Sequence, residues 1–274
     1  MSLCGAGDAD ARQKEVNPTY TITFGDVAEN HAGMQKIGAL HERGFTFDEL
    51  TALQGKMDAL GLATQIHSLS DALRTAVPDL TVEDAHVLVI RKGVQYVLHG
   101  NLSGDTARVM RENRDLQQDT RALMRGRVVN KRARYNLCFA EFDQEPDYAA
   151  GKGRVVSYER VPLVSRIRNT ISAWCGYVLN GEGNYYYDHR QCGIGYHGDS
   201  ERRKVFAIRM GHPMPLYFQW FHRAEPVGPR IQVDLDDGDM YVMCEKSVGS
   251  DWKRRVIPTL RHATGSDKYT VLSA

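Results

Sequence analysis

Several short stretches of the chain alternate apolar and polar residues with the period of two that a half-buried β-strand requires. The first of these, at residues 19–24, is followed by Gly25-Asp26, a pair that favours the end of a strand. Further runs rich in β-forming residues fall at residues 135–142, 191–196, 205–210, 216–221, 231–235, 238–243 and 268–272. Strands therefore dominate the predicted fold, and most of them lie in the second half of the chain.

Helical periodicity is confined to fewer segments. Thr46 and Glu49 have the spacing of a capping box, in which the threonine accepts from free amides of the first turn and the glutamate reaches back. Apolar residues then recur at helical spacing, and a glycine suited to the C-terminal cap follows them: Leu50, Leu53, Met57, Leu60 and Gly61. Other helices are predicted at residues 71–76, 105–125 and 161–174, and a β-hairpin at residues 86–98.

These patterns predict an α+β fold that is mainly β. Residues 1–17 have little to bury and are expected to form a disordered tail. We expect an α+β extension at residues 18–104 and the main β domain at residues 105–274. The chain has no run of about eighteen apolar residues and no apolar signal-peptide core near its start, so we expect an intracellular protein, cytoplasmic or nuclear, with no membrane contact.

Charge is balanced over the whole chain but not locally. The net charge is +1, yet nine basic and three acidic residues lie between Arg108 and Arg134. One interpretation is a solvated helix face with intrahelical pairs such as Arg108 with Glu112 and Arg111 with Asp115. The other is a stripe that binds phosphates or carboxylates, because arginine offers paired donors to both. Aromatic residues are scarce in this run, which counts against stacking on single strands.

The cysteines suggest neither zinc nor disulfides, since the five are widely spaced and contain no Cys-x-x-Cys. Candidate chemistry lies instead at His197 and Asp199. In a strand, residues i and i+2 point to the same face, so this imidazole and carboxylate can aim at a common point. They match two ligands of a 2-His-1-carboxylate iron site. Gly198 between them either leaves room beside a metal or serves a turn.

The order of motifs from about residue 130 to residue 274 resembles the AlkB-like branch of the iron(II)/2-oxoglutarate dioxygenases. An Asn-x-Tyr precedes His-x-Asp, a Gly-Asp-hydrophobic strand follows at residues 238–243, then come a second histidine and a basic residue that opens the last strand. The positions that carry these features are Asn184, Tyr186, His197, Asp199, His262 and Lys268.

The resemblance implies a double-stranded β-helix, the jelly-roll or cupin-like type, with flanking helices. His197, Asp199 and His262 would bind Fe(II), and Lys268 would pair with the distal carboxylate of 2-oxoglutarate. Asn184 and Tyr186 would complete the pocket of this cosubstrate. The implied activity uses 2-oxoglutarate and O2, and couples oxidative decarboxylation to hydroxylation or oxidative demethylation of a substrate.

Two features depart from the family pattern. His262 comes nineteen residues after Met243, so a longer loop with Trp252 and three basic residues, Lys253 to Arg255, must intervene. The family's second arginine in the last strand is absent, since Ala274 stands there. Three interpretations of function stay open. The substrate is a nucleobase in a nucleic acid or nucleotide, held by the basic residues from Arg108 to Arg134 and from Lys253 to Arg255, or it is a protein side chain or small metabolite. The third interpretation is a non-catalytic binding module.

Overall fold

The computed structural model describes residues 17–272, so the expected tail lies, except for Asn17, outside the described residues. The described part is α+β and mainly β, with sixteen strands and seven α-helices. This confirms the coarser part of the predicted fold, an α+β class that is mainly β. No helix within it has the length and apolar character needed to cross a membrane.

The largest element is an eight-stranded sheet whose neighbouring strands are antiparallel except for one parallel pair, β8 with β9. Its order is β4 (Thr64–Ser68), β5 (His86–Ile90), β15 (Met240–Met243), β12 (Val205–Gly211), β1 (Thr19–Gly25), β10 (Asn180–Tyr186), β8 (Tyr135–Ala140) and β9 (Val155–Ser157).

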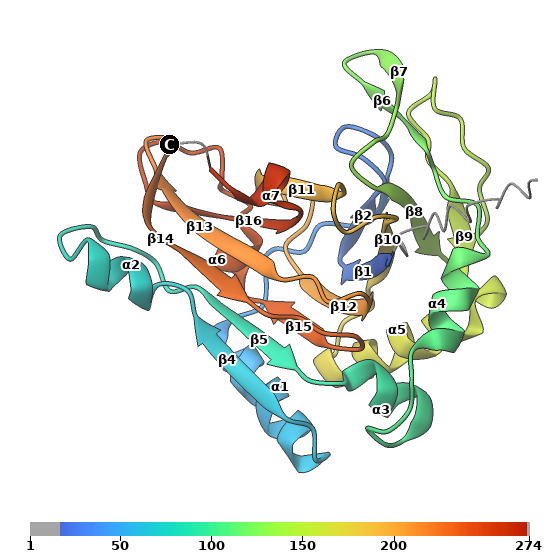
Figure 1. Ribbon diagram of the computed structural model, residues 1–274, viewed down its shortest axis with the longest axis horizontal. Helices are drawn as coiled ribbons and strands as arrows, with labels where there is room; N and C mark the ends of the chain where they lie inside the picture. Colours follow the sequence, from blue (N-terminus) through green and yellow to red (C-terminus); the bar gives the residue numbers. More distant parts are fainter. Residues whose placement is uncertain (1–16, 273–274) are drawn as a thin grey trace, which may run out of the picture.

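A four-stranded antiparallel sheet packs on one face of the large sheet (Figure 1). Its order is β11 (Gly193–His197), β16 (Thr259–Gly265), β13 (Leu216–His222) and β14 (Glu225–Val233). Two small hairpins complete the strands: β2 (Val27–Glu29) with β3 (Lys36–Gly38), and β6 (Arg121–Met124) with β7 (Arg127–Asn130).

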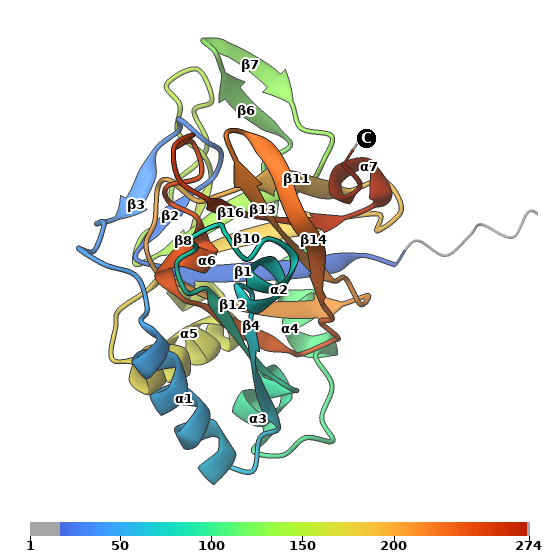
Figure 2. The same cartoon turned by 90° about the vertical axis from the view of Figure 1, so that its left-hand side faces the viewer.

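Helices cover the other face of the large sheet (Figure 2). They are α1 (Phe47–Ala59), α3 (Gly93–His99), α4 (Ala107–Arg114) and α5 (Pro162–Cys175). The remaining helices are short: α2 (Asp71–Ala76), the 3-10 turn η1 (Tyr158–Arg160), α6 (Glu245–Val248) and α7 (Asp267–Thr270).

Strand β12 illustrates why the two faces differ. Phe206 and Ile208 belong to the core beneath the helices, whereas Val205 and Ala207 belong to the core between the sheets. This alternation is the period of two that a strand buried on both faces imposes. Arg209 continues the inter-sheet series, and it is buried there among residues of both sheets.

Helix α1 forms where the sequence predicts it. The Thr46 side chain accepts from the Glu49 amide at 3.2 Å, and the Glu49 carboxylate accepts from the Thr46 amide at 2.8 Å. Leu50, Leu53 and Met57 then bury one stripe of the helix. Helices at residues 71–76 and 161–174 are also confirmed within one residue at each end.

Two local predictions were wrong. The predicted hairpin at residues 86–98 is strand β5 followed by helix α3, because β5 already has β4 and β15 as neighbours and leaves no edge for a partner. The predicted helix at residues 105–125 ends at Arg114, and the β6–β7 hairpin follows. Arg125 and Gly126 both have positive φ in its turn, a conformation that suits a two-residue hairpin loop.

The predicted division at residue 104 has no counterpart in the sheets. Strands β1, β4 and β5 all belong to the large sheet, and β1 lies near its centre between β10 and β12. The predicted last strand at residues 268–272 was also wrong, since Asp267–Thr270 is helix α7. As with the predicted hairpin, the neighbouring positions in the sheet are already filled. Strand β1 hydrogen-bonds to both β10 and β12, so no gap remains between these strands for a C-terminal strand.

Candidate metal centre

His197 and His262 come together because of strand pairing. His197 ends β11, His262 lies in β16, and the two are cross-strand partners after an irregularity between Ile194 and His197. Asp199 follows β11, where its amide donates to the carbonyl of Val248 at 3.0 Å. The structure thus brings together the three residues that the sequence selects as metal ligands.

The three side chains converge at a spacing that suits one metal ion. The Nε2 atoms of His197 and His262 lie 3.5 Å and 3.7 Å from Asp199 Oδ1. One donor atom from each residue lies within 4.8 Å of the others. Two imidazoles and one carboxylate are a donor set suited to Fe(II) with positions left open.

The surroundings of both histidines suit metal binding. His197 Nδ1 lies 2.8 Å from the carbonyl of Gly195, so a proton on Nδ1 donates there and leaves the Nε2 lone pair free. Burial lowers the pKa of His262 well below its usual range, and the nearby His197 and Arg202 lower it further. A neutral imidazole is the form that binds a metal.

The longer loop before His262 packs beside the metal ligands. It contains α6, and its Gly249 carbonyl oxygen would lie 2.0 Å from a Cβ added to Gly198. Trp252 in the same loop donates its indole N–H to Ser200 Oγ at 3.0 Å. A side chain at position 198 would therefore collide with this loop, which is a reason for glycine that neither interpretation, room beside a metal or a turn, had included.

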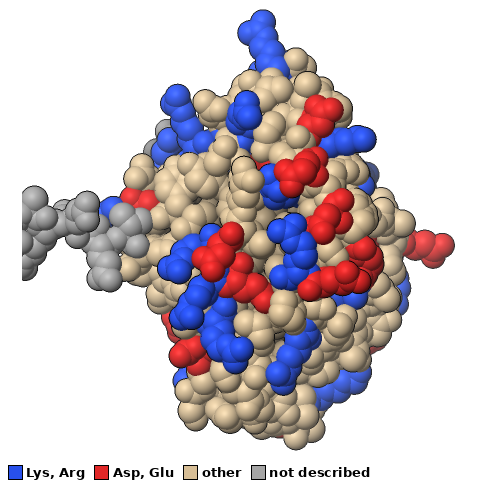
Figure 3. Space-filling model, turned by 90° about the vertical axis from the view of Figure 1, so that its right-hand side faces the viewer, with Lys and Arg blue, Asp and Glu red and all other residues tan. Residues whose placement is uncertain are grey.

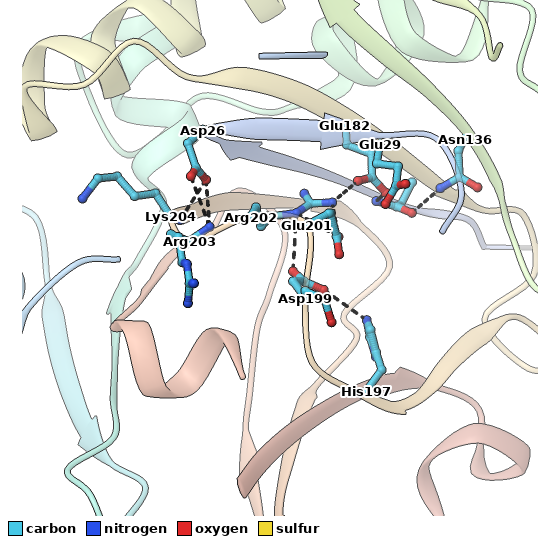
Figure 4. A network of polar contacts seen from close by, with 12 residues as sticks. Asp26, Glu29, Asn136, Glu182, His197, Asp199, Glu201, Arg202, Arg203 and Lys204 are labelled. Carbon is cyan, nitrogen blue, oxygen red and sulfur yellow. Dashed lines mark hydrogen bonds and ion pairs between the residues drawn. The ribbon is translucent and has the colours of Figure 1, made fainter. Parts of the chain in front are cut away.

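Arg202 connects Asp199 to the large sheet (Figure 4). Its Nε lies 3.6 Å from Asp199 Oδ2, and its Nη2 lies 2.9 Å from Glu201 Oε1. The same Nη2 also bonds to Glu182 on β10, and the Arg202 and Glu182 side chains are both almost fully buried. Sequence reasoning missed Arg202, although an arginine three residues after a carboxylate ligand is a usable signal. The network holds the carboxylate oxygen that faces away from the histidines.

A cavity of about 560 Å³ opens beside the triad, between the two sheets. All three candidate ligands line it, and so do Asn184 and Tyr186 from β10. The Asn184 amide is already bonded: its Oδ1 accepts from Arg134 Nε at 2.6 Å and from Asn136, and its Nδ2 donates to Glu182. The Tyr186 side chain is buried, which raises the pKa of its hydroxyl.

Lys268 does not reach this cavity. It lies on α7 with an exposed side chain, 5.4 Å from the ring centroid of Tyr269, and it is absent from the cavity lining. Several basic residues do line the cavity, and Arg209 of β12, which is 1% exposed, is the most deeply buried of them. Sequence reasoning overlooked it, although an arginine inside the otherwise apolar run Val205 to Met210 was a signal.

The basic run from Arg108 to Arg134 divides among α4, the β6–β7 hairpin and the segment after it. The expected intrahelical pairs do not form: Glu112 accepts from the amides of Leu163 and Val164, and Asp115 lies 3.7 Å from Arg114. Figure 3 shows the side of the molecule that lies on the right in Figure 1. Acidic and basic side chains are interspersed on it, and basic ones project at the top, where the β6–β7 hairpin lies. From the two basic segments, Arg134 and Lys253 line the cavity.

Comparison with known proteins identifies the family of the chain. No family model matches the chain, so the AlkB-like resemblance stays a prediction. The chain is 46% identical over 258 residues to "Uncharacterized protein R156" of Acanthamoeba polyphaga mimivirus, and the match covers 93% of this chain and 98% of that protein. At this identity and coverage, the chain belongs to the same family as the mimivirus protein.

Proposed function

We propose that the protein is an Fe(II)/2-oxoglutarate-dependent dioxygenase. The observation that carries the proposal is the convergence of His197, Asp199 and His262 on one point in a cavity between two sheets. The donors are two imidazoles and a carboxylate, and the cavity gives a cosubstrate and a substrate access to the same point.

The strand order supports a double-stranded β-helix as the underlying fold. From β10 to β16 the chain alternates between the sheets: large, small, large, small, small, large, small. A jelly roll needs eight such strands in two sheets. The eighth would lie in the large sheet between β10 and β12, and β1 occupies this position. We therefore propose a double-stranded β-helix that is closed by its N-terminal strand.

The protein's own residues would hold and orient the reactants. His197, Asp199 and His262 would bind Fe(II), and Arg202 would fix the orientation of Asp199 through its second oxygen. When bound, the iron would supply the activation of O2 that couples decarboxylation of 2-oxoglutarate to oxidation of a C–H bond. Both sheets supply buried wall residues such as Arg209 and His262, while exposed lining residues such as Lys36 and Lys253 leave the cavity open to solvent.

The direct test combines metal binding with turnover. Protein loaded with Fe(II) under anaerobic conditions should bind 2-oxoglutarate, and exposure to O2 should then yield succinate and carbon dioxide, measured by mass spectrometry. Screening oxidised nucleosides, peptides and metabolites in the same assay would identify the substrate. Absence of metal binding by the wild-type protein would instead favour a binding module on the same fold.

A nucleic acid or nucleotide is the substrate candidate with a specific observation behind it. Arg134 and Lys253 come from two separate basic segments, and both line the cavity. Phosphates held by these segments would place an attached base near the triad. A protein side chain or a small metabolite remains the alternative, since the cavity is also lined by acidic residues, Glu29, Glu182 and Glu201.

A further inference from the structure

We infer that Arg209 is the binding site for a carboxylate of a small acidic ligand, and that the N-terminal strand β1 helps to position it. That this ligand is 2-oxoglutarate rests on the proposed function. The anion site itself rests on the surroundings of Arg209 alone.

Arg209 is a fully buried cation whose partners are all neutral. Its Nη1 donates to Thr21 Oγ1 at 2.7 Å and lies 3.7 Å from Met214 Sδ, and its Nη2 donates to Thr264 Oγ1 at 3.4 Å. Its Nε has no hydrogen-bond partner among the described residues. A guanidinium is always charged, and a buried charge is costly unless an opposite charge pairs with it. No aspartate or glutamate within residues 17–272 supplies that pair, so an anionic ligand in the adjoining cavity is the missing partner.

Other hydrogen-bond donors surround the same place. Tyr186 and Tyr241 line the cavity. Arg209 lies close enough to both to lower the pKa of their hydroxyl groups, against the larger opposite effect of burial. Burial raises the pKa of Tyr241 to about 12, so its hydroxyl stays protonated and can donate to a carboxylate. Neither hydroxyl bonds to another described residue. A guanidinium with two free phenols is a donor set that suits a carboxylate.

The position of Arg209 relative to the triad fits a ligand with two acidic ends. Thr264, which accepts from Arg209, lies two residues after His262 on β16, so both point to the same face. Two residues along a strand span about 7 Å. A short dicarboxylate could therefore place one end on Arg209 and the other at the metal ligands. Tyr241 also lines the cavity and lies near both ends of this span, since Arg209 lowers and Asp199 raises the pKa of its hydroxyl.

Strand β1 makes this arrangement possible. In the sheet, Thr21 is the cross-strand partner of Asn184 on one side and of Arg209 on the other. The three residues form a row across the sheet, and all three line the cavity. Strand β1, next to β10, thus contributes Thr21, and the next strand in the sheet, β12, contributes the cation of Arg209. This explains how the chain can lack a basic residue after His262 that reaches the site.

The test is ligand binding by the full chain, measured by isothermal titration calorimetry with and without Mn(II), which cannot support turnover here. We expect Arg209→Met to weaken 2-oxoglutarate binding about tenfold to a hundredfold, because it removes charge-assisted hydrogen bonds. Metal affinity should change less than about threefold. Arg209→Lys should restore part of the loss, and Lys268→Ala, the matched control, should bind like the wild type.

Thermal denaturation separates this role from a structural one. Arg209→Met removes an uncompensated buried charge, so without ligand it should melt at or above the wild-type temperature. Added 2-oxoglutarate should then raise the Tm of the wild type and of Lys268→Ala, but not that of Arg209→Met. Succinate and inorganic phosphate serve as comparison anions.

The outcomes distinguish the two proposals. Unchanged 2-oxoglutarate binding in Arg209→Met would overturn the inference, and so would loss of binding in Lys268→Ala with Arg209→Met intact. If the wild type binds metal but no carboxylate, the inference fails while the metal centre stands. If it binds carboxylates through Arg209 but no metal, the proposed oxygenase function fails and the anion site remains.

Discussion

His197 and His262 are direct cross-strand partners, with ring centroids 4.5 Å apart. Their positions are separated by many residues in the chain, yet the register between β11 and β16 places both imidazoles on one face of the small sheet. The irregularity after Ile194 sets this register, as bulges near functional sites often do. The geometry of the candidate centre is therefore a property of sheet pairing, and Asp199 is the ligand that depends on a loop.

This arrangement predicts that each of the three ligands is needed for metal binding. His197→Ala, Asp199→Ala and His262→Ala should each weaken Co(II) binding by at least tenfold and abolish 2-oxoglutarate turnover, because each removes one of three protein donors. Visible absorption of bound Co(II) measures the first effect, and succinate formation measures the second.

His222→Ala is the matched control, because this histidine ends β13 outside the cavity lining. It should bind Co(II) like the wild type. Full activity in His262→Ala together with loss in His222→Ala would move the third ligand to His222.

Gly198 predicts a different kind of effect on the same centre. A Cβ at this position would lie 2.0 Å from the Gly249 carbonyl oxygen and 2.8 Å from Trp252 Cβ. Gly198→Ala must therefore push the loop before His262 away from Asp199. We expect a loss of about 1–3 kcal/mol in unfolding free energy and weaker metal binding.

Gly55→Ala is the comparison variant for that measurement. Gly55 lies in α1, and an added Cβ meets nothing within 4 Å. This substitution should stabilise the protein by up to about 1 kcal/mol in urea denaturation and leave metal binding unchanged. Equal stability of Gly198→Ala and the wild type would show that the loops containing Gly198 and Gly249 can separate without a loss of unfolding free energy.

Local features of the fold could be predicted from the sequence where one segment determines its own structure. The capping box at Thr46 and Glu49 and the alternation at residues 19–24 are of this kind. Residues 86–98 failed, because two apolar runs separated by a short polar turn suit a hairpin equally well. Only the presence of β4 and β15 beside β5 decides in favour of a helix, and that pairing involves residues distant in sequence.

The candidate site shows the same limit. The spacing of His197 and Asp199 could be found within one short segment, and the place of His262 came from the order of motifs. Arg209 could not be placed in this way, because its role depends on β1, which lies far away in the chain but adjacent in the sheet. The sequence pattern predicted β1 as a strand and gave no sign that it would occupy the centre of the large sheet.

Glu49 predicts how stability depends on pH. Burial alone would raise the pKa of Glu49, but hydrogen bonds from Arg43, Tyr177 and the Thr46 amide outweigh it and lower the pKa to about 2. Because the folded-state pKa is lower than the ordinary value of 4.5, the carboxylate stabilises the fold fully above about pH 4.5. This contribution should be lost as the pH falls from about 4.5 to about 2.

The measurement compares Glu49→Gln with the wild type in urea at several pH values. The variant should be less stable at pH 6, and the difference should shrink at pH 3. Glu42→Gln, at an exposed neighbouring position, should show little difference at either pH. A difference that stays constant from pH 6 to pH 3 would assign the effect of Glu49 to packing instead of charge.

The basic segments predict how a nucleic acid would bind, if one is the substrate. Arg125 and Arg127 are exposed on the β6–β7 hairpin, and Lys253 to Arg255 are exposed in the loop before β16. Each phosphate that they neutralise releases counterions, so affinity should fall steeply with salt, with a log–log slope of about −0.9 per contact for duplex DNA. Fluorescence titration with short single- and double-stranded DNA and RNA at two salt concentrations measures this slope.

The double variant Arg125→Ala/Arg127→Ala and the triple variant with Lys253, Arg254 and Arg255 changed to Ala should each reduce both the affinity and the steepness of its salt dependence.

Arg166→Ala should change neither, because Arg166 is exposed on α5, on the helical face of the large sheet. The acidic side chains interspersed on the face in Figure 3 weaken the overall field, so only contacts near the cavity should contribute. If the wild type binds no oligonucleotide at low salt, the basic segments are a solvated surface. The acidic cavity residues would then direct the search toward proteins and small metabolites.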